Sequence, residues 1–274
     1  MFSSFFFFLL SKFLKSRSFA LYVNSKSSVR CSFFLMICYE ISTWQFTKLN
    51  TQVKINIMDK NPQKIKEMFN QIATKYDSNN NLISFGLHKT VKKIAVNSFD
   101  FSGKCLDLCT GTGDIAEILH KKGCNVTGLD FSKNMLEIAK KKYPFIEFIE
   151  DDCTSLPFED NSFDAITISF GLRNIEDYNK ALDEIYRVLK PNGKFFHLDF
   201  CKENVLANIL YNFIIPKLVK IFYENDLPYK YLVQSKQEFF DLKTLQHIFE
   251  NHGFKIKTQK TFLFETIACQ LYTK

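Results

Sequence analysis

The chain has 274 residues, enough for one large α/β core with some length to spare. Its net charge of +7 is concentrated in residues 1–57, where seven basic residues face one acidic residue. The remainder therefore carries about +1, which excludes a nucleic-acid footprint. The eight cysteines are scattered, with no C-x-x-C pair and no His/Cys cluster at zinc spacing, so we expect reduced thiols and no metal site.

Residues 1–57 do not have the pattern of a folded domain. They are basic, Ser-rich and almost free of acidic residues, as transit peptides are. A misplaced start is the other explanation, because an amphipathic helical pattern begins directly after Met58. Both explanations predict an N-terminal extension over 1–57 and a single folded domain over 58–274.

From Pro62 onward, helical and extended patterns alternate. We expect helices over 62–76 and about 85–97, a strand over Lys104–Leu108, a helix over Asp114–Lys122 and a strand over Asn125–Asp130. Then follow a helix capped by Ser132, strands over Ile146–Glu150 and Phe163–Phe170, a helix over Asn179–Leu189 and a strand over Lys194–Phe200. The chain ends with an apolar helix over 204–223, a helix over Asp241–Asn251, and strands over Lys255–Thr261 and Glu265–Tyr272.

This alternation predicts a doubly wound parallel sheet. The last two strands follow each other without a helix, which indicates an antiparallel hairpin at one edge. Nicotinamide-dependent dehydrogenases usually keep alternating at this point, so the ending favours a methyltransferase.

A glycine-rich turn after the first strand predicts a nucleoside-containing cofactor. Gly111 and Gly113 let the backbone approach a ligand, and the helix beginning near Asp114 directs free N–H groups toward it. Asp130 ends the second strand, where a carboxylate can accept hydrogen bonds from ribose hydroxyls. The loop alone also fits a nicotinamide or flavin site.

Four further motifs narrow this interpretation. They are Asp151-Asp152-Cys153, the stretch Leu156–Asp164, the string Ile168-Ser169-Phe170-Gly171-Leu172-Arg173-Asn174, and the turn Tyr186–Lys194. Their order resembles class I S-adenosylmethionine (SAM)-dependent methyltransferases. With Ala73–Asp77 and Ser84–His88 upstream, the chain from 62 to 274 resembles the quinone C-methyltransferases of bacteria and mitochondria, and the Phe-Gly-Leu-Arg-Asn string is the specific part.

The resemblance implies a Rossmann-like, doubly wound seven-stranded α/β sheet with an antiparallel C-terminal hairpin. It also implies SAM as cofactor and a polyprenyl quinol as acceptor. The reaction would be C-methylation in respiratory quinone biosynthesis, on demethylmenaquinol or on a 2-polyprenyl-6-methoxy-1,4-benzoquinol. A methyltransferase for another small molecule, a nucleotide-dependent oxidoreductase and a non-catalytic binding module are the alternatives.

The same resemblance assigns the site residues. Cofactor contacts are Gly111, Thr112 and Gly113 in the loop, Asp130 on the ribose, Asp152 and Cys153 around the adenine, and Ser169. Arg173 and Asn174 are the catalytic candidates, with Tyr76 and His88 weaker ones. From the residues alone, Arg173 also fits a surface ion pair with Glu176 or Asp177, and Asn174 fits a helix cap. Ser169 also fits a core hydroxyl bonded to backbone, and Asp107 fits a role in orienting the loop through backbone amides.

The apolar face of 204–223, flanked by Lys217 and Lys220, predicts contact with a membrane surface or a prenyl tail, or else an ordinary lid or core helix. No transmembrane span is expected. A homodimer is compatible with the sequence. The expected location is the cytoplasm or the inner-membrane periphery in a bacterium, and the mitochondrial matrix side if 1–57 is a transit peptide.

Overall fold

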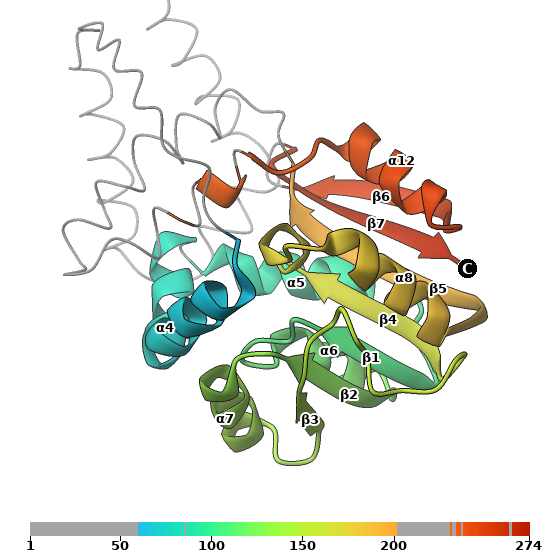
Figure 1. Cartoon of the computed structure of the whole chain (residues 1–274). Coiled ribbons are helices and arrows are strands. Elements are labelled where there is room, and N and C mark those ends of the chain that lie inside the picture. Colours follow the sequence, from blue (N-terminus) through green and yellow to red (C-terminus); the bar gives the residue numbers. More distant parts are fainter. Residues whose placement is uncertain (1–59, 85, 202–230, 232–233, 237, 263–264) are drawn as a thin grey trace, which may run out of the picture. The chain divides into compact units, whose positions relative to one another are not determined.

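Seven strands form one mixed sheet in the unit Asn56–Lys274 (Figure 1). The computed structural model describes residues 60–84, 86–201, 231, 234–236, 238–262 and 265–274, all of which belong to the unit Asn56–Lys274. The expected helix over 204–223 and the extension over 1–57 lie outside these residues. None of the helices in the described ranges is long and apolar enough to cross a membrane.

The sheet order is β3-β2-β1-β4-β5-β7-β6. The five parallel strands are β1 (Lys104–Leu108), β2 (Asn125–Asp130), β3 (Glu147–Glu150), β4 (Phe163–Ser169) and β5 (Leu189–Phe200). Two antiparallel strands, β6 (Lys255–Phe262) and β7 (Ile267–Thr273), close one edge, with β7 paired to β5. The predicted seven-stranded doubly wound sheet and its C-terminal hairpin are confirmed.

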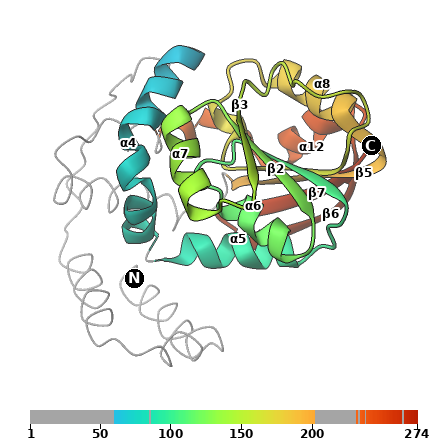
Figure 2. The same cartoon turned by 90° about the horizontal axis from the view of Figure 1, so that it is seen from below.

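Helices cover both faces of the sheet. In one hydrophobic cluster, α5 (Leu87–Asn97), α6 (Asp114–Lys121) and α7 (Lys133–Lys142) pack on one set of strand residues. In a second cluster, α8 (Tyr178–Val188) and α12 (Leu242–Asn251) pack on the other set. The strands serve both clusters because successive side chains point to opposite faces, as Phe195 and Phe196 of β5 do. Figure 2 shows α5 on one side of the sheet and α8 and α12 on the other.

Local chemistry sets the helix starts. Ser132 accepts a hydrogen bond from the backbone N–H of Met135, and Asp241 accepts one from Thr244, so both predicted N-caps are present. Asp177 caps α8 in the same way. The first helix, α4 (Pro62–Ile83), runs well beyond the predicted end at residue 76, up to the turn in which Gly86 has φ 77°.

One boundary prediction was wrong. The turn Pro191-Asn192-Gly193 was expected to separate a helix from a strand starting at Lys194, but β5 already begins at Leu189. Leu189 pairs with Phe163 of β4 before the register shifts, so the turn is an irregularity within the paired segment. Asn192 takes the left-handed φ of 64° there, which asparagine tolerates better than most residues.

The strand order reverses between β1 and β4, which are neighbours in the sheet although they are separated by β2 and β3 in the chain. In open α/β sheets, ligands bind outside the carboxyl ends of the strands at such a switch point. The loop after β1 and the turn after β4 therefore lie at the expected binding edge.

Candidate active site

The loop after β1 is shaped by two glycines in left-handed conformations. Gly113 has φ 86°, and a Cβ there would lie 3.0 Å from Cδ2 of Tyr143 and 3.1 Å from Cζ of Phe148. Gly111 has φ 56° and faces open space, because a Cβ there would meet nothing within 4 Å. The loop thus packs tightly on one side and leaves its backbone open to a ligand on the other.

Asp130 ends β2 beside this loop, with both of its carboxylate oxygens engaged by backbone. Oδ2 accepts from the N–H of Gly111 at 2.8 Å and Oδ1 from that of Ser132 at 2.9 Å. Burial raises the pKa of Asp130 to about 6, although these backbone donors oppose the shift. Each oxygen keeps a second lone pair, so a pair of ribose hydroxyls can still be accepted.

Asp107 is buried beneath the loop and accepts hydrogen bonds from it and from β4. Its two oxygens accept from the hydroxyls of Thr110 and Thr167, both at 2.6 Å, and the residue is 1 % exposed. Burial raises its pKa to about 6. Asp107 therefore joins the loop to β4 through two hydroxyls, where the sequence suggested backbone amides.

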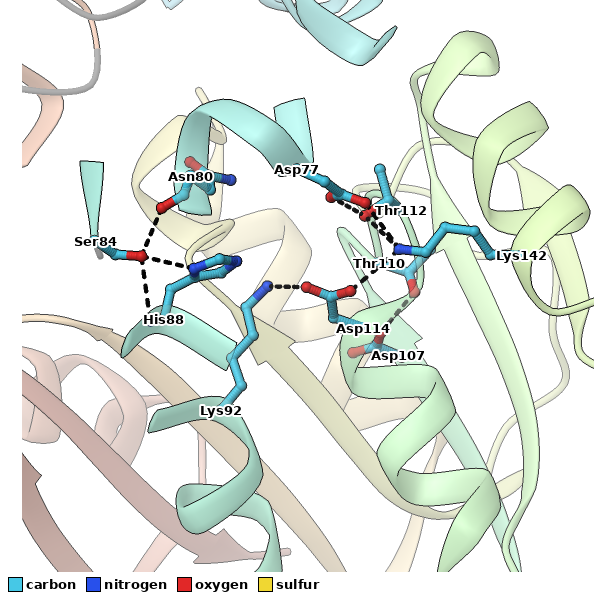
Figure 3. A network of polar contacts seen from close by, with 10 residues as sticks. All are labelled: Asp77, Asn80, Ser84, His88, Lys92, Asp107, Thr110, Thr112, Asp114 and Lys142. Carbon is cyan, nitrogen blue, oxygen red and sulfur yellow. Dashed lines mark hydrogen bonds and ion pairs between the residues drawn. The ribbon is translucent and has the colours of Figure 1, made fainter. Parts of the chain in front are cut away.

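A network of charged and polar side chains ties α4 and α7 to the loop (Figure 3). The Thr112 hydroxyl donates to Oδ1 of Asp77 at 2.7 Å, and Nζ of Lys142 lies 2.9 Å from the other oxygen of Asp77. Lys142 also lies 3.3 Å from Oδ1 of Asp114 at the start of α6. The predicted contact residue Thr112 thus connects the loop to a helix far away in the sequence.

Lys92 of α5 completes this network at 3.1 Å from Oδ2 of Asp114. Burial alone would raise the pKa of Asp114, but the charges of Lys92 and Lys142 outweigh it and hold that pKa well below its usual value. Burial lowers the pKa of Lys92, and Asp114 more than offsets this, so the pKa is raised. At neutral pH Asp114 and the two lysines beside it are therefore charged.

His88, one of the weaker candidates, lies at the edge of the network. Its Nδ1 is 2.7 Å from the Ser84 hydroxyl, which itself donates to the Asn80 carbonyl at 2.5 Å, so Nδ1 is the donor. Burial, followed by the charge of Lys92, lowers the pKa of His88 to about 4. The ring is therefore neutral, and Nε2 is a buried acceptor with no hydrogen-bond partner among the described residues.

The predicted adenine contacts follow β3. The backbone N–H of Asp151 donates to the carbonyl of Asp130, which places this turn beside the ribose position. Asp152 is exposed and accepts from the N–H of Thr154 at 2.9 Å, whereas Cys153 is buried. A hydrogen bond between Cys153 and Cys109 joins this turn to the start of the cofactor loop. That bond, together with burial, raises the pKa of the Cys109 thiol.

The turn after β4 packs directly against the same loop. A Cβ at Gly171 would lie 2.5 Å from Cβ of Cys109, so only glycine fits this contact. Just before it, the Ser169 hydroxyl is buried without a partner in the described residues, which contradicts the alternative of a backbone-bonded core hydroxyl. An orphaned hydroxyl at the ligand edge fits a bound group that supplies the missing partner.

Arg173 and Asn174 belong to the short helix η1 (Leu172–Asn174) that follows. Arg173 is 4 % exposed, and its Nη1 lies 2.5 Å from Oδ1 of Asp199 at the end of β5. The alternative of a surface pair with Glu176 or Asp177 is therefore wrong. Asn174 donates from Nδ2 to the Phe170 carbonyl at 3.3 Å and accepts at Oδ1 from the hydroxyl of Tyr231 at 3.0 Å.

The family of the chain follows from its similarity to known proteins. The model of the ubiE/COQ5 methyltransferase family matches residues 57–274. The chain belongs to this family. Family membership makes the protein a methyltransferase and implies SAM as its methyl donor. Open space at Gly111, spare lone pairs on Asp130 and the orphaned Ser169 hydroxyl all fit that cofactor.

Relatives within the family are similar over nearly their whole length. A demethylmenaquinone methyltransferase of Staphylococcus epidermidis is 39 % identical over 76 % of this chain and 92 % of its own length. One from Bacillus cereus is 36 % identical over 77 % of this chain and 96 % of its own length.

Solved structures share the fold at much lower identity. A SAM-dependent methyltransferase from Thermotoga maritima is 20 % identical with a TM-score of 0.59, covering 76 % of this chain and 99 % of that one. The [4+2]-cyclase SpnF is 15 % identical with a TM-score of 0.59, covering 77 % and 95 %. The second likeness shows that this fold also hosts other chemistry, so residues of the site have to carry the functional argument.

The structure of this ubiE/COQ5 family member brings all predicted cofactor residues to one edge of the sheet. Other residues of the site were missed by sequence reasoning. Asp199 carried a signal, since it is a carboxylate inside an apolar strand pattern, while Lys142 and Tyr231 had none beyond ordinary helix composition. Asp77 stood within a motif that the sequence singled out, but without an assigned role.

Proposed function

We propose that the protein uses SAM to methylate a ring carbon of a polyprenyl quinol, with demethylmenaquinol as the leading acceptor. The relatives named demethylmenaquinone methyltransferases support the naphthoquinol, and a methoxybenzoquinol is the second acceptor. The observation that carries the proposal is the contact of Gly171 with Cys109, because it seats Arg173 and Asn174 beside the cofactor loop.

In this proposal the cofactor is held along the edge of the sheet already described. Asp130 accepts the ribose hydroxyls, Asp152 and Cys153 border the adenine, and the loop from Gly111 to Gly113 lies against the remainder, with Ser169 supplying a hydroxyl. When bound, SAM supplies an electrophilic methyl group on a sulfonium. The residues of the protein hold and orient the two reactants, which can be worth roughly 7–11 kcal/mol.

The acceptor must be reduced. A quinol hydroxyl resembles a phenol, with a pKa near ~10, and its deprotonation moves electron density onto the adjacent ring carbon. An oxidised quinone is electron-poor and lacks this route. The guanidinium of Arg173 is a cation, so beside the acceptor it favours the phenolate and lowers the cost of forming it.

Asn174 is the second residue that we place beside the acceptor. One of its two amide hydrogens is used on the Phe170 carbonyl, and the other remains to donate to the quinol oxygen. The Tyr231 hydroxyl holds the amide in this orientation by donating to Oδ1. Tyr231 therefore acts as a positioning residue.

Methyl incorporation into a demethylated naphthoquinone, with and without dithionite, tests the proposal. Turnover should require dithionite, and equal rates without it would refute the quinol mechanism. Arg173→Leu should lower kcat far more than SAM affinity, because its charge acts on the transition state, and Arg173→Lys should recover only part of the rate. Arg187→Leu is the matched control, since Arg187 of α8 pairs with Glu184 and Asp160.

The prenyl tail of such an acceptor belongs in a lipid bilayer, so we propose that the protein meets its substrate at a membrane surface.

An Arg173→Leu variant that turns over at the wild-type rate would show that Arg173 has only a structural role. Mass spectrometry of quinones in a strain lacking the gene would name the acceptor, because the unmethylated precursor accumulates.

A further inference from the structure

A carboxylate in the fifth strand holds the side chain of Arg173. Asp199 lies in the run Phe195–Phe200 of β5 and is 1 % exposed. Its Oδ1 lies 2.5 Å from Nη1 of Arg173 and accepts from the backbone N–H of Phe200 at 2.8 Å. Burial raises the pKa of Asp199, while the charge of Arg173 and the Phe200 N–H oppose this rise. A carboxylate in such surroundings costs free energy unless it is paired, and Arg173 supplies the pairing charge.

Two aromatic rings confine the guanidinium further. Cζ of Arg173 lies 5.3 Å from the centre of the Phe200 ring and 5.8 Å from that of the Phe170 ring, and the two rings are 5.2 Å apart. A guanidinium is planar and is attracted to aromatic rings, so a carboxylate at one N–H together with two nearby rings restricts its orientation. Phe170 precedes Gly171, whose contact with Cys109 seats this turn beside the cofactor loop.

Asp199 occupies only part of the guanidinium. Nη1 makes the one side-chain hydrogen bond of Arg173 among the described residues, and Nε is buried without a partner there. Oδ2 of Asp199 is unpartnered in the same way, so a single N–H···O contact joins the pair. A bidentate pair would use two of the five N–H groups of a guanidinium. The single contact therefore fixes the group while it leaves the other N–H groups for a further oxygen.

Stability alone is a weak explanation for this pair, because apolar side chains of similar volume can often replace a buried ion pair without loss of stability. His197, two residues before Asp199, is buried and neutral, since burial lowers its pKa to about 3, so it does not compete with Asp199 for Arg173. Asp199 is the only acidic group in the described part of the chain that pairs with Arg173. A buried cation with one dedicated partner at the ligand edge points to a need for a fixed position.

We infer that Asp199 is a positioning residue for the methyl transfer: it holds the guanidinium of Arg173 so that the remaining N–H groups face the acceptor oxygen. The inference rests on the proposed function, in which that guanidinium favours the phenolate. Asp199 itself contacts neither reactant and exchanges no proton with them. Its effect on the rate comes from geometry, since a displacement of about 1 Å from a productive position can cost roughly 100-fold in rate.

Asp199→Asn tests this role on the full-length protein with SAM and a short-tailed demethylmenaquinol under dithionite. The amide keeps the shape of the side chain but loses the charge that holds Arg173, so kcat should fall about 30-fold. Affinity for S-adenosylhomocysteine, measured by calorimetry, should stay within about twofold. Asp160→Asn is the matched control, because Asp160 lies 2.8 Å from Nη1 of Arg187 in an exposed pair, and both quantities should be unaltered. An unchanged kcat in folded Asp199→Asn, or equal losses of kcat and cofactor affinity, would overturn the inference.

A double-mutant cycle with Arg173→Leu separates positioning from an independent role. If Asp199 acts only through Arg173, adding Asp199→Asn to Arg173→Leu should leave kcat within about twofold of that of Arg173→Leu alone. The double variant should also be at least as stable as Arg173→Leu, because it no longer buries an unpaired carboxylate. If the two losses of kcat multiply, Asp199 acts independently of Arg173 and the inference is wrong.

A measurement without turnover keeps the two proposals apart. The arginines of the chain are Arg17, Arg30, Arg173 and Arg187, so in the full-length protein with 15N-labelled arginine the Arg173 signals can be assigned by their loss in Arg173→Leu. Rotation about the Cζ–Nη1 bond of Arg173 should be slow in the wild type and faster in Asp199→Asn.

Free rotation of that group in the wild type would overturn the inference even when quinol methylation is observed, and this result decides the matter if Asp199→Asn does not fold. If rotation is restricted but the wild type methylates no quinol, the proposed function fails and the role of Asp199 in that reaction fails with it.

Discussion

Asp130→Asn tests the assignment of the ribose contact with the least disturbance of shape. The wild-type carboxylate spends one lone pair of each oxygen on the N–H groups of Gly111 and Ser132 and keeps one on each for the cofactor. In the variant, one oxygen becomes an NH2 group that cannot accept. One ribose hydroxyl therefore loses its acceptor, and the other faces a neutral oxygen in place of a charged one.

The magnitude follows from these two bonds. Hydrogen bonds to charged groups contribute about 1.5–3 kcal/mol and neutral ones about 0.5–1.5 kcal/mol, so the variant should lose about 2–4 kcal/mol of binding free energy. That corresponds to roughly 30- to 700-fold weaker SAM binding. Stability should change less, because the amide removes the cost of a buried charge while it loses one backbone hydrogen bond.

Calorimetric titration with SAM at pH 7.5 measures the loss, and thermal unfolding of the same samples checks the fold. Asp100→Asn provides the matched control, since Asp100 is exposed before β1 and should bind SAM as the wild type does. Affinity within twofold of the wild type in a folded Asp130→Asn protein would remove Asp130 from the ribose site.

Three other outcomes are expected. SAM affinity should fall as the pH drops through about 6, because Asp130 then takes up a proton, and a pH-independent affinity would contradict the assignment. The raised pKa of Asp130 has the opposite effect on folding: its contribution to the free energy of unfolding is fully present below pH ~3.8 and is lost as the pH rises through about 6. Lys92→Met should lower the free energy of unfolding by roughly 2–4 kcal/mol, as measured by denaturant unfolding. The loss is smaller than for a fully buried pair because Lys142 still contacts Asp114, and adding Asp114→Asn to the same chain should recover part of it. A chain that starts at Met58 should be soluble and active in the methyl-incorporation assay; an inactive truncated protein beside an active full-length one would show that residues 1–57 contribute to the fold.

Much of the fold follows from local chemistry that the sequence displays. Gly111 and Gly113 are needed because the backbone takes positive φ there, and Ser132 and Asp241 cap helices through bonds to residues three positions away. The apolar strands and the closely spaced final pair follow from burial on both faces of the sheet and from the short connection between β6 and β7. Such signals lie within a few residues of each other, so they can be read before any tertiary contact is known.

The partners of the charged and polar site residues were decided only by the tertiary structure. From the residues alone, the alternative to a catalytic Arg173 was an ion pair with Glu176 or Asp177, its neighbours in sequence, but the structure pairs it with Asp199. The reason lies in the sheet: β4 and β5 run parallel with Ser169 opposite Leu198, so the turn after β4 meets the carboxyl end of β5.

The same holds for Thr112 with Asp77 and for Asn174 with Tyr231, which join segments 35 and 57 residues apart. A side chain that forms an ion pair or hydrogen bond can do so with any suitable group that the fold brings near, and the sequence does not encode that choice locally. The sequence therefore determined the fold and which residues stand at the cofactor edge. Only the packing of distant segments determined which partners these residues have, and how deeply each residue is buried.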